Sequence, residues 1–360
     1  MASFDEVLKD CTKLGTKIPT SEYLENGKYP IIDQGQNDIA GYYDSDDGLF
    51  EDVPTIVFGD HTRVVKYVDK PCFLGADGVK LLCPLDKDIN CKYLFYQLSC
   101  ADIPNTGYNR HFKWVKALNF KIPSSDEQNH VVEVLDKVTE LISLRKQQLA
   151  KLDELVKARF VEMFGDPVVN SKRWPVETIE NHIDLLTGFP FDSSGYVSKG
   201  VNICGGLIIM PQKIDWSACK HWPQITGYED YILRPNDIVI ALDRPWISNG
   251  FKIAMVDREH LPALLIQRTA RIRAVDINQH YLMQSLLLGR FDKHCNITGS
   301  LVPHISPKDI KSYSVMIPPI ELQNQFATFE ERVDQQKQTV QQSLEKLELM
   351  KKALMQEYFG

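Results

Sequence analysis

The second half of this chain repeats a long segment of the first. Residues 122–165 and 317–360 align without a gap at a constant offset of 195, and 14 of the 44 pairs are identical. The identical pairs include Ile122/Ile317, Pro123/Pro318, Gln128/Gln323, Asn129/Asn324, Leu149/Leu344 and Gly165/Gly360. Unrelated segments would share only a few such pairs. We therefore predict a pseudo-two-fold internal repeat, in which two copies of one unit form a pseudo-symmetric molecule.

The repeat continues upstream with an offset that changes along the chain. Tyr23 matches Tyr196 at an offset of 173, and Asn90 matches Asn278 at an offset of 188. Because the offset rises from 173 to 195, the second copy carries 22 additional residues before its terminal segment. The terminal segments are constant in length and the bodies vary. This pattern indicates a constant structural frame that carries two bodies with different recognition surfaces.

Composition limits the class of protein. A chain of 360 residues can bury two cores, and no apolar run approaches the ~20 residues that a membrane span needs. Acidic residues at positions 5, 6 and 10 exclude a signal peptide at the N-terminus, and eight cysteines without a C-x-x-C pair indicate free thiols in a reducing cytoplasm. The net charge of −7 argues against a general polyanion binder but permits a local basic groove.

Each repeated terminal segment has the heptad pattern of a long helix, over 126–164 and 320–359. Each helix would be roughly 54 Å long, with proline before its start and glycine at its end. Two equal helices pack most simply against each other as an antiparallel coiled coil, with the two bodies at opposite ends. The alternative is that each helix packs only on its own body. The residues expected to pack the frame are Val138, Ile142, Leu149, Leu152, Val333, Val340, Leu344 and Leu347.

The two bodies, 1–125 and 165–319, mix short β-like runs with turn residues, which predicts an α/β (α+β) fold. A short helix is expected over 92–100. Strands are expected at Tyr29–Ile32, 55–58, 63–68, 79–83, 237–242, 252–256 and 264–274.

The order of motifs at the helix boundaries resembles that of a known family. The first helix follows Ile122-Pro123 with Glu127-Gln128, and the second follows Ile317-Pro318-Pro319 with Gln323. The first helix leaves through Phe164-Gly165-Asp166-Pro167 towards Trp174-Pro175. Along its whole length the chain resembles the specificity subunit of a type I DNA restriction-modification complex. The resemblance divides it into recognition domains at 1–125 and 165–319, a central helix at 126–164 and a distal helix at 320–360.

The resemblance also implies a function. Each body would be a target recognition domain that reads one half of a bipartite double-stranded DNA site. The helices would fix the gap between the halves and dock two modification subunits, which methylate adenine using S-adenosylmethionine. Restriction subunits, which are ATP-driven translocases and nucleases, would join them. S-adenosylmethionine, ATP and Mg²⁺ would then belong to the partner subunits, and this chain would hold no cofactor.

No catalytic motif is found in the sequence. There is no N-P-P-[FYW] motif, no phosphate-binding loop and no histidine spacing typical of a metal site; Gly205-Gly206 lacks the third glycine of a dinucleotide fingerprint. These absences favour a non-catalytic subunit. Two alternatives stay open, a fused DNA methyltransferase or nuclease chain and a coiled-coil scaffold without a nucleic-acid role.

The candidate DNA contacts are basic, amide and aromatic residues, because phosphates and guanine edges attract Lys and Arg, and adenine edges attract Asn and Gln. One cluster lies just before the first long helix, and its counterpart precedes the second; both could instead be polar connectors. The first comprises Tyr108, Asn109, Arg110, His111 and Lys113, and the second Thr298, Ser300 and His304.

Three further clusters are candidates, each with a structural alternative. His61, Arg63 and Lys66 follow a predicted strand, and the matching region contains Arg244, Trp246, Ser248 and Asn249; the tryptophan could clamp DNA or belong to the core. In the strand predicted over 264–274, Arg271 and Arg273 share one face while Arg268 points to the other, as a groove-facing stripe or a solvated sheet face. Lys17 and Phe189 lie in equivalent early segments, either loops to DNA or structural turns.

Overall fold

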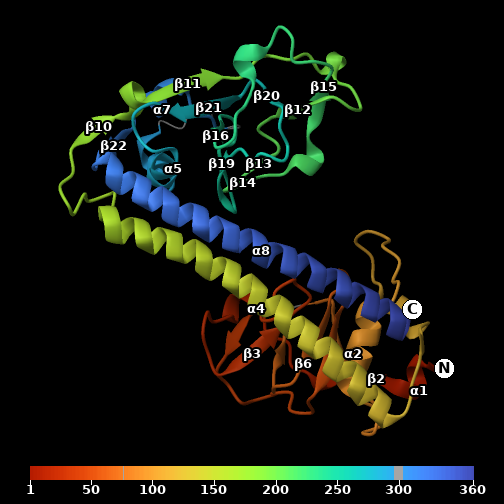
Figure 1. Ribbon diagram of the computed structural model, residues 1–360. Coiled ribbons are helices and arrows are strands. Elements are labelled where there is room, and N and C mark those ends of the chain that lie inside the picture. The colour runs from red at the N-terminus through yellow and green to blue at the C-terminus, as the bar shows by residue number, and fades with distance from the viewer. Residues whose placement is uncertain (76, 296–302) are drawn as a thin grey trace. The chain divides into compact units, whose positions relative to one another are not determined.

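The computed structural model describes residues 1–75, 77–295 and 303–360, and these form two compact units. Unit 1 comprises Met1–Gln147 and Gln341–Gly360, and unit 2 comprises Gln148–Val340. Each unit contains part of both long helices, α4 (Ser125–Phe164) and α8 (Ile320–Phe359) (Figure 1). Their bounds agree with the predicted helices to within one residue, and each helix has 40 residues.

The body of unit 1 has two small sheets and a strand pair, ordered β2-β8-β5-β6, β4-β3-β7 and β1-β9. Its strands are β1 (Ala2–Ser3), β2 (Leu8–Asp10), β3 (Tyr29–Ile32), β4 (Gly41–Tyr43), β5 (Thr55–Gly59), β6 (Val65–Val68), β7 (Phe73–Leu74), β8 (Val79–Pro84) and β9 (Asn119–Phe120). Its short helices are α1 (Phe4–Val7), α2 (Cys91–Cys100) and α3 (Phe112–Lys116).

The body of unit 2 has the corresponding order in β11-β21-β16-β19, β15-β12-β20 and β10-β22. These strands are β10 (Val176–Thr178), β11 (Ile183–Thr187), β12 (Val201–Cys204), β15 (Lys220–Trp222), β16 (Ile238–Ala241), β19 (Ile253–Met255), β20 (Ala263–Leu265), β21 (Thr269–Ala274) and β22 (Ser314–Met316). Two hairpins are added, β13 (Ile209–Met210) with β14 (Lys213–Ile214) and β17 (Trp246–Ile247) with β18 (Gly250–Phe251). The short helices are α5 (Gln279–Leu288), α6 (Phe291–His294) and α7 (Pro307–Lys311).

The two bodies therefore share one topology. The central antiparallel pair places Ile56 opposite Leu82 in unit 1 and Ile238 opposite Ile272 in unit 2. All four side chains are fully buried, and each pair belongs to the main apolar cluster of its own unit. In both units the smaller sheet contains a parallel pair, β3 with β7 and β12 with β20. The internal repeat thus extends through the bodies, where the sequences have diverged most.

One predicted strand was wrong. The run 264–274 is not a single strand, because β20 and β21 belong to different sheets and a turn at Ile266–Arg268 separates them. Arg268 has φ = 64°, which no strand permits, and the hydroxyl of Thr269 donates to the carbonyl of Ile266 across the turn. The alternation of arginines that we inferred from a continuous strand is therefore interrupted before Thr269.

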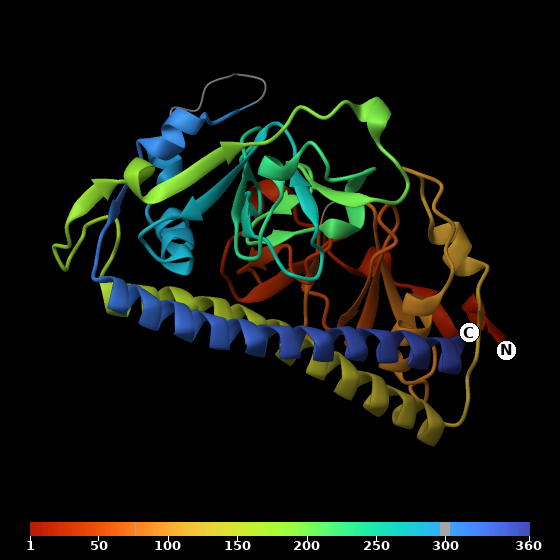
Figure 2. The same cartoon turned by 45° about the horizontal axis from the view of Figure 1, so that its top comes forward.

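The long helices pack antiparallel within each unit. In unit 1, Lys146 Nζ lies 3.0 Å from Glu348 Oε1, and in unit 2, Lys337 Nζ lies 2.7 Å from Asp153 Oδ1. In both pairs a residue late in one helix meets a residue earlier in the other, and the views in Figure 1 and Figure 2 show the two unit 2 segments side by side. Of the predicted frame residues, Val138, Val333, Val340 and Leu344 are buried, and Ile142, Leu149, Leu152 and Leu347 are half-buried.

A duplicated hydrogen-bond network fixes a short helix to each long helix. In unit 1, Gln128 Oε1 accepts from the Asn90 amide at 2.9 Å and Gln128 Nε2 donates to the Pro123 carbonyl at 2.9 Å. The Asn90 side chain accepts from the first amides of α2, while its Nδ2 donates to Asn129. Both Gln128 and the amide that it caps lie at the junction of α2 with α4, so the network sets the position of α2.

Unit 2 repeats this network atom for atom. Gln323 Oε1 accepts from the Asn278 amide at 2.8 Å, and Gln323 Nε2 donates to the Pro318 carbonyl at 2.8 Å. Asn278 caps α5 and donates to Asn324 at 2.9 Å. Because Gln128 and Gln323 are 2% and 1% exposed, water cannot replace these bonds. The identity of the Gln-Asn pair in both copies thus has a direct structural cause.

We expect Gln323→Met to destabilise unit 2 by about 1–3 kcal/mol, because it leaves a buried amide and a buried carbonyl without partners. The measurement is the urea midpoint of the full chain, followed by tryptophan fluorescence. Gln325→Met makes the same change two positions away at an exposed site of α8 and should leave the midpoint unchanged. Equal midpoints for the two variants would contradict a structural role for the network.

Candidate nucleic-acid interface

Three segments distant in sequence meet at one end of the central strand of unit 1. The Asp60 amide, directly after β5, donates to the Gly78 carbonyl at 2.6 Å, and the Asp60 carbonyl accepts from the His111 amide at 2.8 Å. The Asp60 carboxylate accepts from the Phe112 amide at 2.7 Å, so it also holds the start of α3. We call residues 59–63, 77–78 and 105–111 the unit 1 loop cluster.

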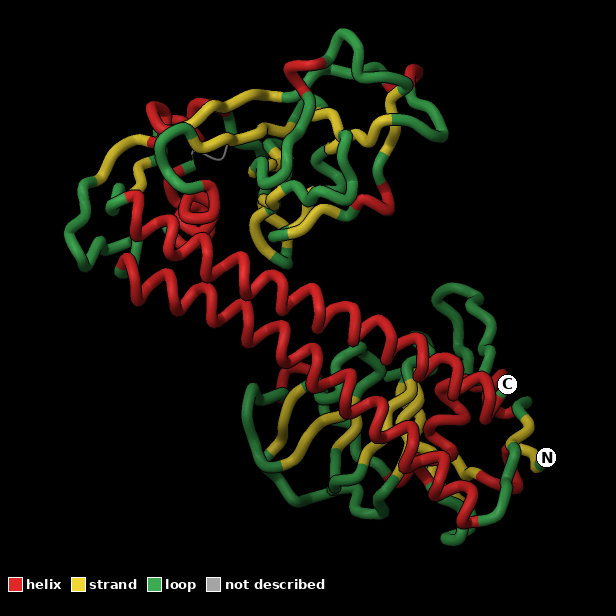
Figure 3. The backbone as a smooth tube through the Cα atoms, viewed as in Figure 1, coloured by secondary structure: helices red, strands yellow, loops and turns green. Residues whose placement is uncertain are grey.

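Two aromatic rings are stacked at the surface of the unit 1 loop cluster. The rings of His61 and Tyr108 lie 4.6 Å apart and within 8° of parallel, and His61 Nδ1 lies 3.2 Å from the Asn109 carbonyl oxygen. Tyr108 is 87% exposed, and Arg110 next to Asn109 is also exposed. The loop between α2 and α3, which carries these residues, stands out from the body of unit 1 (Figure 3). It therefore presents a ring, an amide and a guanidinium to solvent.

The absence of a side chain at Gly78 permits this arrangement. Gly78 has φ = 89°, and a Cβ atom at this position would lie 2.7 Å from both Gln34 Nε2 and His61 Cδ2. Gln34 in turn accepts from the His61 amide at 3.2 Å and donates to the Asp77 carbonyl at 3.0 Å. A side chain at position 78 would therefore displace both His61 and the glutamine that orients it.

Basic groups surround one exposed acid in this cluster. Lys17 Nζ lies 3.0 Å from Asp77 Oδ1, and its hydrogen bond and charge, with the more distant charge of Arg110, lower the pKa of Asp77. Lys17 also joins the smaller sheet through a parallel bridge to Leu74. Lys113 is exposed on α3, with Nζ 5.1 Å from the centre of the Trp114 ring. Lys17 and Arg110 thus lie near Asp77 at this surface.

Unit 2 has the same three-segment junction with different side chains. The Leu242 amide donates to the Arg268 carbonyl at 2.9 Å, and the Leu242 carbonyl accepts from the Ile305 amide at 3.0 Å. Leu242, Arg268 and Ile305 thus occupy the places of Asp60, Gly78 and His111. We call residues 242–249, 266–268 and 303–305 the unit 2 loop cluster.

The unit 2 loop cluster places two predicted arginines and a histidine together. Arg268 Nη1 lies 3.3 Å from Asp243 Oδ2, Asp243 forms a β-bridge with His304, and the Arg244 amide donates to the Pro303 carbonyl at 2.8 Å. The Arg244 and Arg268 side chains are exposed, and both residues have the positive φ that is uncommon outside glycine, 46° and 64°.

The hairpin β17–β18 forms the rest of this cluster. Trp246 is half-buried, stacks on Phe251 at 5.0 Å and packs against the main apolar cluster, so it anchors the hairpin. Ser248 and Asn249 occupy its exposed tip. The core alternative for Trp246 therefore describes its position better than an exposed clamp does. Phe189 is likewise half-buried, in ring contact with Phe191, Tyr228 and Tyr231.

Several predicted contacts lie inside the units instead. Lys66 is buried and its ammonium group bonds the Asp33 carboxylate and the Asn37 carbonyl, because it faces the loop beneath β6. His111 is fully buried, with Nδ1 2.9 Å from the Asp60 carbonyl oxygen, and thus supports the loop that we expected it to extend. Arg63 is half-buried and donates to the Ile103 carbonyl at 3.0 Å. His111 and Arg63 thus support the unit 1 loop cluster, and Lys66 holds the loop between β3 and β4.

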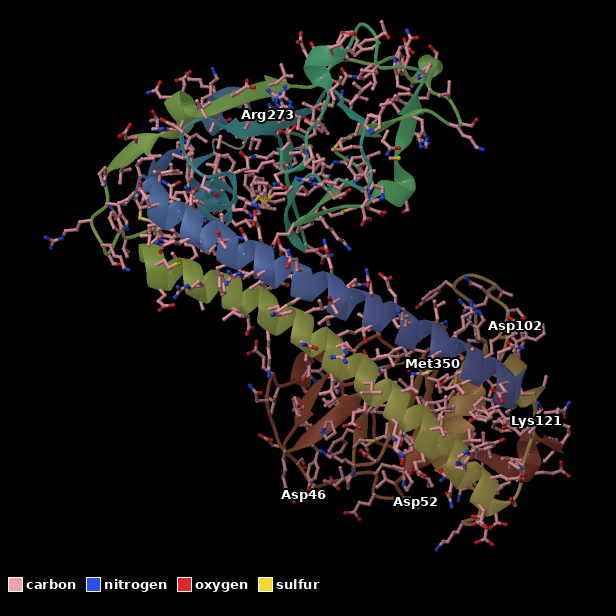
Figure 4. The ribbon with its side chains drawn as sticks, viewed as in Figure 1. Asp46, Asp52, Asp102, Lys121, Arg273 and Met350 are labelled. Atoms are coloured by element: carbon pink, nitrogen blue, oxygen red, sulfur yellow. The ribbon has the colours of Figure 1, made fainter. Side chains whose placement is uncertain are left out.

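The arginine stripe of β21 is also internal. Arg271 is 4% exposed and bonds Asp184. Arg273, labelled in Figure 4, donates to both carboxylate oxygens of Asp237 at 2.5 and 2.8 Å. Burial lowers the pKa of Arg271, as does the charge of Arg273, against the opposing effect of Asp184. The stripe is therefore an ion-paired layer of the sheet rather than an open basic face. Thr298 and Ser300 lie outside the described residues.

The residues that organise both clusters were missed from the sequence. Gln34, Asp60 and Asp243 make the deciding contacts, yet each is an ordinary polar residue in a loop. For Asp60 and Asp243 a usable signal was their place just after the matched strands β5 and β16, where the repeat brings the loops to the same end of the sheet. Gln34 follows β3 and had no such signal.

The described residues contain neither a metal site nor a membrane span. No group of three or more His, Cys, Asp and Glu side chains within them is arranged to hold a metal ion. None of their helices has the length and apolar character to cross a bilayer.

Comparison with known proteins finds a family and individual chains that are similar in sequence to this one. A family described as type I restriction modification DNA specificity domain matches residues 5–154. The EcoAI specificity subunit of Escherichia coli is 27% identical over 53% of this chain and 33% of its own length. The MjaVIII specificity subunit of Methanocaldococcus jannaschii is 24% identical over 80% of this chain and 74% of its own length. The chain thus spans a third of the first relative and three quarters of the second.

Solved structures show the same fold. The type I restriction-modification S subunit from M. genitalium matches with a TM-score of 0.59 at 16% identity, over 99% of this chain and 95% of that one. A structure concerned with complex assembly and conformational transition of the type I R-M system matches with a TM-score of 0.52 at 15% identity, over 98% and 94%. The sequence resemblance to type I specificity subunits is confirmed, and so is the α+β architecture that it implied.

We expect Asp60→Ala to loosen the unit 1 loop cluster without unfolding unit 1, because the Phe112 amide loses its acceptor. Hydrogen exchange should show faster exchange of the peptide that covers 105–113, with little change in β5 and β8. Asp69→Ala, at an exposed acid in the same unit, serves as the control. Unchanged exchange at 105–113 would show that the carboxylate does not hold this loop.

Proposed function

We propose that this chain, whose residues 5–154 belong to the family of type I restriction modification DNA specificity domains, is the DNA sequence-specificity subunit of a type I restriction-modification complex. The observation that carries the proposal is the pair of loop clusters. Each unit gathers three segments at the same end of the same sheet, through equivalent backbone hydrogen bonds. The side chains on these segments differ between the units. Two loop clusters with the same backbone arrangement and different side chains are suited to recognise two different DNA sequences.

The exposed side chains have the chemistry that base and phosphate recognition needs. In unit 1, Arg110 can donate to a guanine edge or a phosphate, Asn109 presents an amide for adenine, and the Tyr108 ring offers an apolar face. In unit 2, Arg244 and Arg268 supply the guanidinium groups, and Ser248 and Asn249 supply hydroxyl and amide at the hairpin tip. None of these residues needs a cofactor for this role.

The long helices would bind the partner subunits of such a complex. Charged side chains such as Glu140 and Lys157 are exposed on α4, so partner subunits can bind there. The partners would be two modification subunits that carry S-adenosylmethionine and, where present, restriction subunits that use ATP and Mg²⁺. Methylation and cleavage would be reactions of these partners, and the chain alone would carry out neither.

If each body recognises one half of the DNA site, exchanging one body should change only one half-site. Replacing the body 1–125 with the equivalent body of a relative should alter one half of the methylated DNA motif and leave the other half and the spacing unchanged. Genome-wide sequencing of methylated adenine in cells that contain the modification subunits reads the motif directly. A change in both halves would contradict independent recognition, and methylation by the purified chain alone would contradict a non-catalytic subunit.

Single loop residues should matter for affinity in the assembled complex. We expect Arg110→Ala and Arg244→Ala each to weaken binding of the target duplex by about 1–3 kcal/mol, because each removes a charged donor at an exposed loop. Fluorescence anisotropy at several salt concentrations separates loss of a phosphate contact, which lowers the salt slope, from loss of a base contact. Lys87→Ala, at an exposed loop outside the cluster, is the matched control. Target affinity unaffected by both arginine variants would move the interface away from these loops.

A further inference from the structure

Arg268 occupies a place in the unit 2 loop cluster where the unit 1 loop cluster has a glycine, Gly78. Each residue comes just before the second strand of the central pair, and its carbonyl accepts the amide of Leu242 or Asp60. Both residues have a positive φ, 64° for Arg268 and 89° for Gly78. Glycine adopts such a conformation without steric cost. Because unit 1 makes the turn with glycine, the turn itself does not require an arginine at this place.

The direction of a side chain at this place is the same in both units. A Cβ atom on Gly78 would lie 2.7 Å from His61 Cδ2. His61 and Asp243 are equivalent, since each is the second residue after the first strand of the central pair, β5 or β16. In unit 2 the Arg268 side chain reaches this counterpart of His61, with Nη1 3.3 Å from Asp243 Oδ2. The repeated geometry therefore directs Arg268 across the loops towards Asp243.

A second exchange between the units leaves room beside the arginine. Gln34 and Gly206 are equivalent, because each is the second residue after the first strand of the parallel pair, β3 or β12. The backbone of Gly206 lies close to the turn, since a Cβ atom on it would be 3.8 Å from the Arg268 carbonyl oxygen. The buried Lys252 donates from its ammonium group to the Gly206 carbonyl. Unit 1 thus has glutamine and glycine at these two loops, and unit 2 has glycine and arginine.

The Arg268 guanidinium is held at one nitrogen and open at the opposite edge. The Arg268 side chain is 74% exposed and that of Asp243 is 36% exposed. Within the described part of the chain, Nε and Nη2 of Arg268 form no hydrogen bond or ion pair with the protein. A guanidinium that a carboxylate already orients loses less side-chain freedom when it binds a ligand. The pair therefore presents two parallel N–H donors in a defined direction.

This open edge suits guanine better than another base or a phosphate. Guanine presents two acceptors, O6 and N7, on its major-groove edge, and two parallel N–H groups can donate to both. Each of the other bases offers at most one acceptor on that edge. A phosphate at the same place would lie near the Asp243 carboxylate, whose charge repels it. Base edges carry no net charge, so the ion pair favours a contact with a base.

We propose that Arg268 recognises one guanine in the half-site bound by unit 2, and that Asp243 is the positioning residue that holds its guanidinium. This inference rests on the proposed function and names the base that one place in the site selects. Unit 1 has no side chain at the equivalent place, Gly78, and presents the stacked rings of His61 and Tyr108 beside it. The assignment is therefore made for one half-site alone.

The test measures base preference position by position. The full chain in complex with its modification subunits selects from duplexes randomised in the half-site that exchange of the body 1–125 leaves unchanged, and the bound duplexes are sequenced. The parent should prefer guanine at one position by about tenfold or more. Arg268→Gly should remove this preference and leave the other positions unchanged. This variant places the unit 1 residue at a positive φ that glycine favours, so the turn is retained.

The role of Asp243 has its own readout. Asp243→Asn keeps the size of the side chain and removes the charge that holds Arg268, so it should lower the guanine preference by about threefold or more at the same position. Affinity for an unrelated duplex should not fall, because the repulsion of phosphate is also removed. Asp243→Glu, which keeps the carboxylate, should restore the preference in part. Arg258→Ala and Asp230→Asn, at exposed positions elsewhere in unit 2, are the matched controls and should change no position.

The outcomes separate this inference from the proposed function. A guanine preference that survives Arg268→Gly would overturn the assignment, even though the complex still selects a defined sequence. An equal loss at every position in Asp243→Asn would show a structural role and contradict positioning. A parent complex that selects no sequence at all would instead overturn the proposed function. The urea midpoint of each variant, compared with that of the parent, shows that the fold is retained.

Discussion

The side chain of Gln128 in unit 1, or of Gln323 in unit 2, fixes the start of a short helix to the start of a long helix. A glutamine side chain can accept and donate at once, and here it spans a helix cap on one side and a proline carbonyl on the other. The proline carbonyl, which lies just before the long helix, accepts the side-chain amide of the glutamine in both units. The short helix, the start of the long helix and the connecting strand therefore take one relative position in each unit.

This fixed junction lets the remaining sequence vary. The apolar clusters of the two bodies share a topology, but few of the residues are identical. The loops that we propose for DNA contact are joined by equivalent backbone hydrogen bonds at Asp60 and Leu242, while exposed side chains such as Arg110 and Arg244 differ between the units. The added hairpins β13–β14 and β17–β18 show that insertions are accepted in the body of unit 2, while both long helices keep 40 residues.

The long helices, their bounds and the α+β class followed from sequence because heptad periodicity and an internal repeat are long-range signals that many residues share. The strand over 264–274 failed for a local reason: no glycine or proline marks the turn at Gln267-Arg268, which Arg268 forms with a positive φ. The candidate DNA contacts likewise include some that residue type predicted well and some that it did not. Residue type indicated Tyr108, Asn109, Arg110, Arg244 and Arg268, which are exposed. It could not separate them from Lys66, His111 and Arg271, because burial depends on partners such as Asp33, Asp60 and Asp184 that lie far away in sequence.

The division of the chain has a consequence for its synthesis. Unit 2 is one continuous stretch, Gln148–Val340, whereas unit 1 combines Met1–Gln147 with Gln341–Gly360. Domains form on the ribosome in the order in which their residues emerge. Val131 and Leu135 belong to a cluster that Leu354 and Phe359 help to cover, so this apolar surface stays open while the 218 residues 136–353 are translated. Unit 2 is therefore complete before unit 1, although synthesis of unit 1 begins first. For most of its elongation the nascent chain exposes this apolar surface of unit 1.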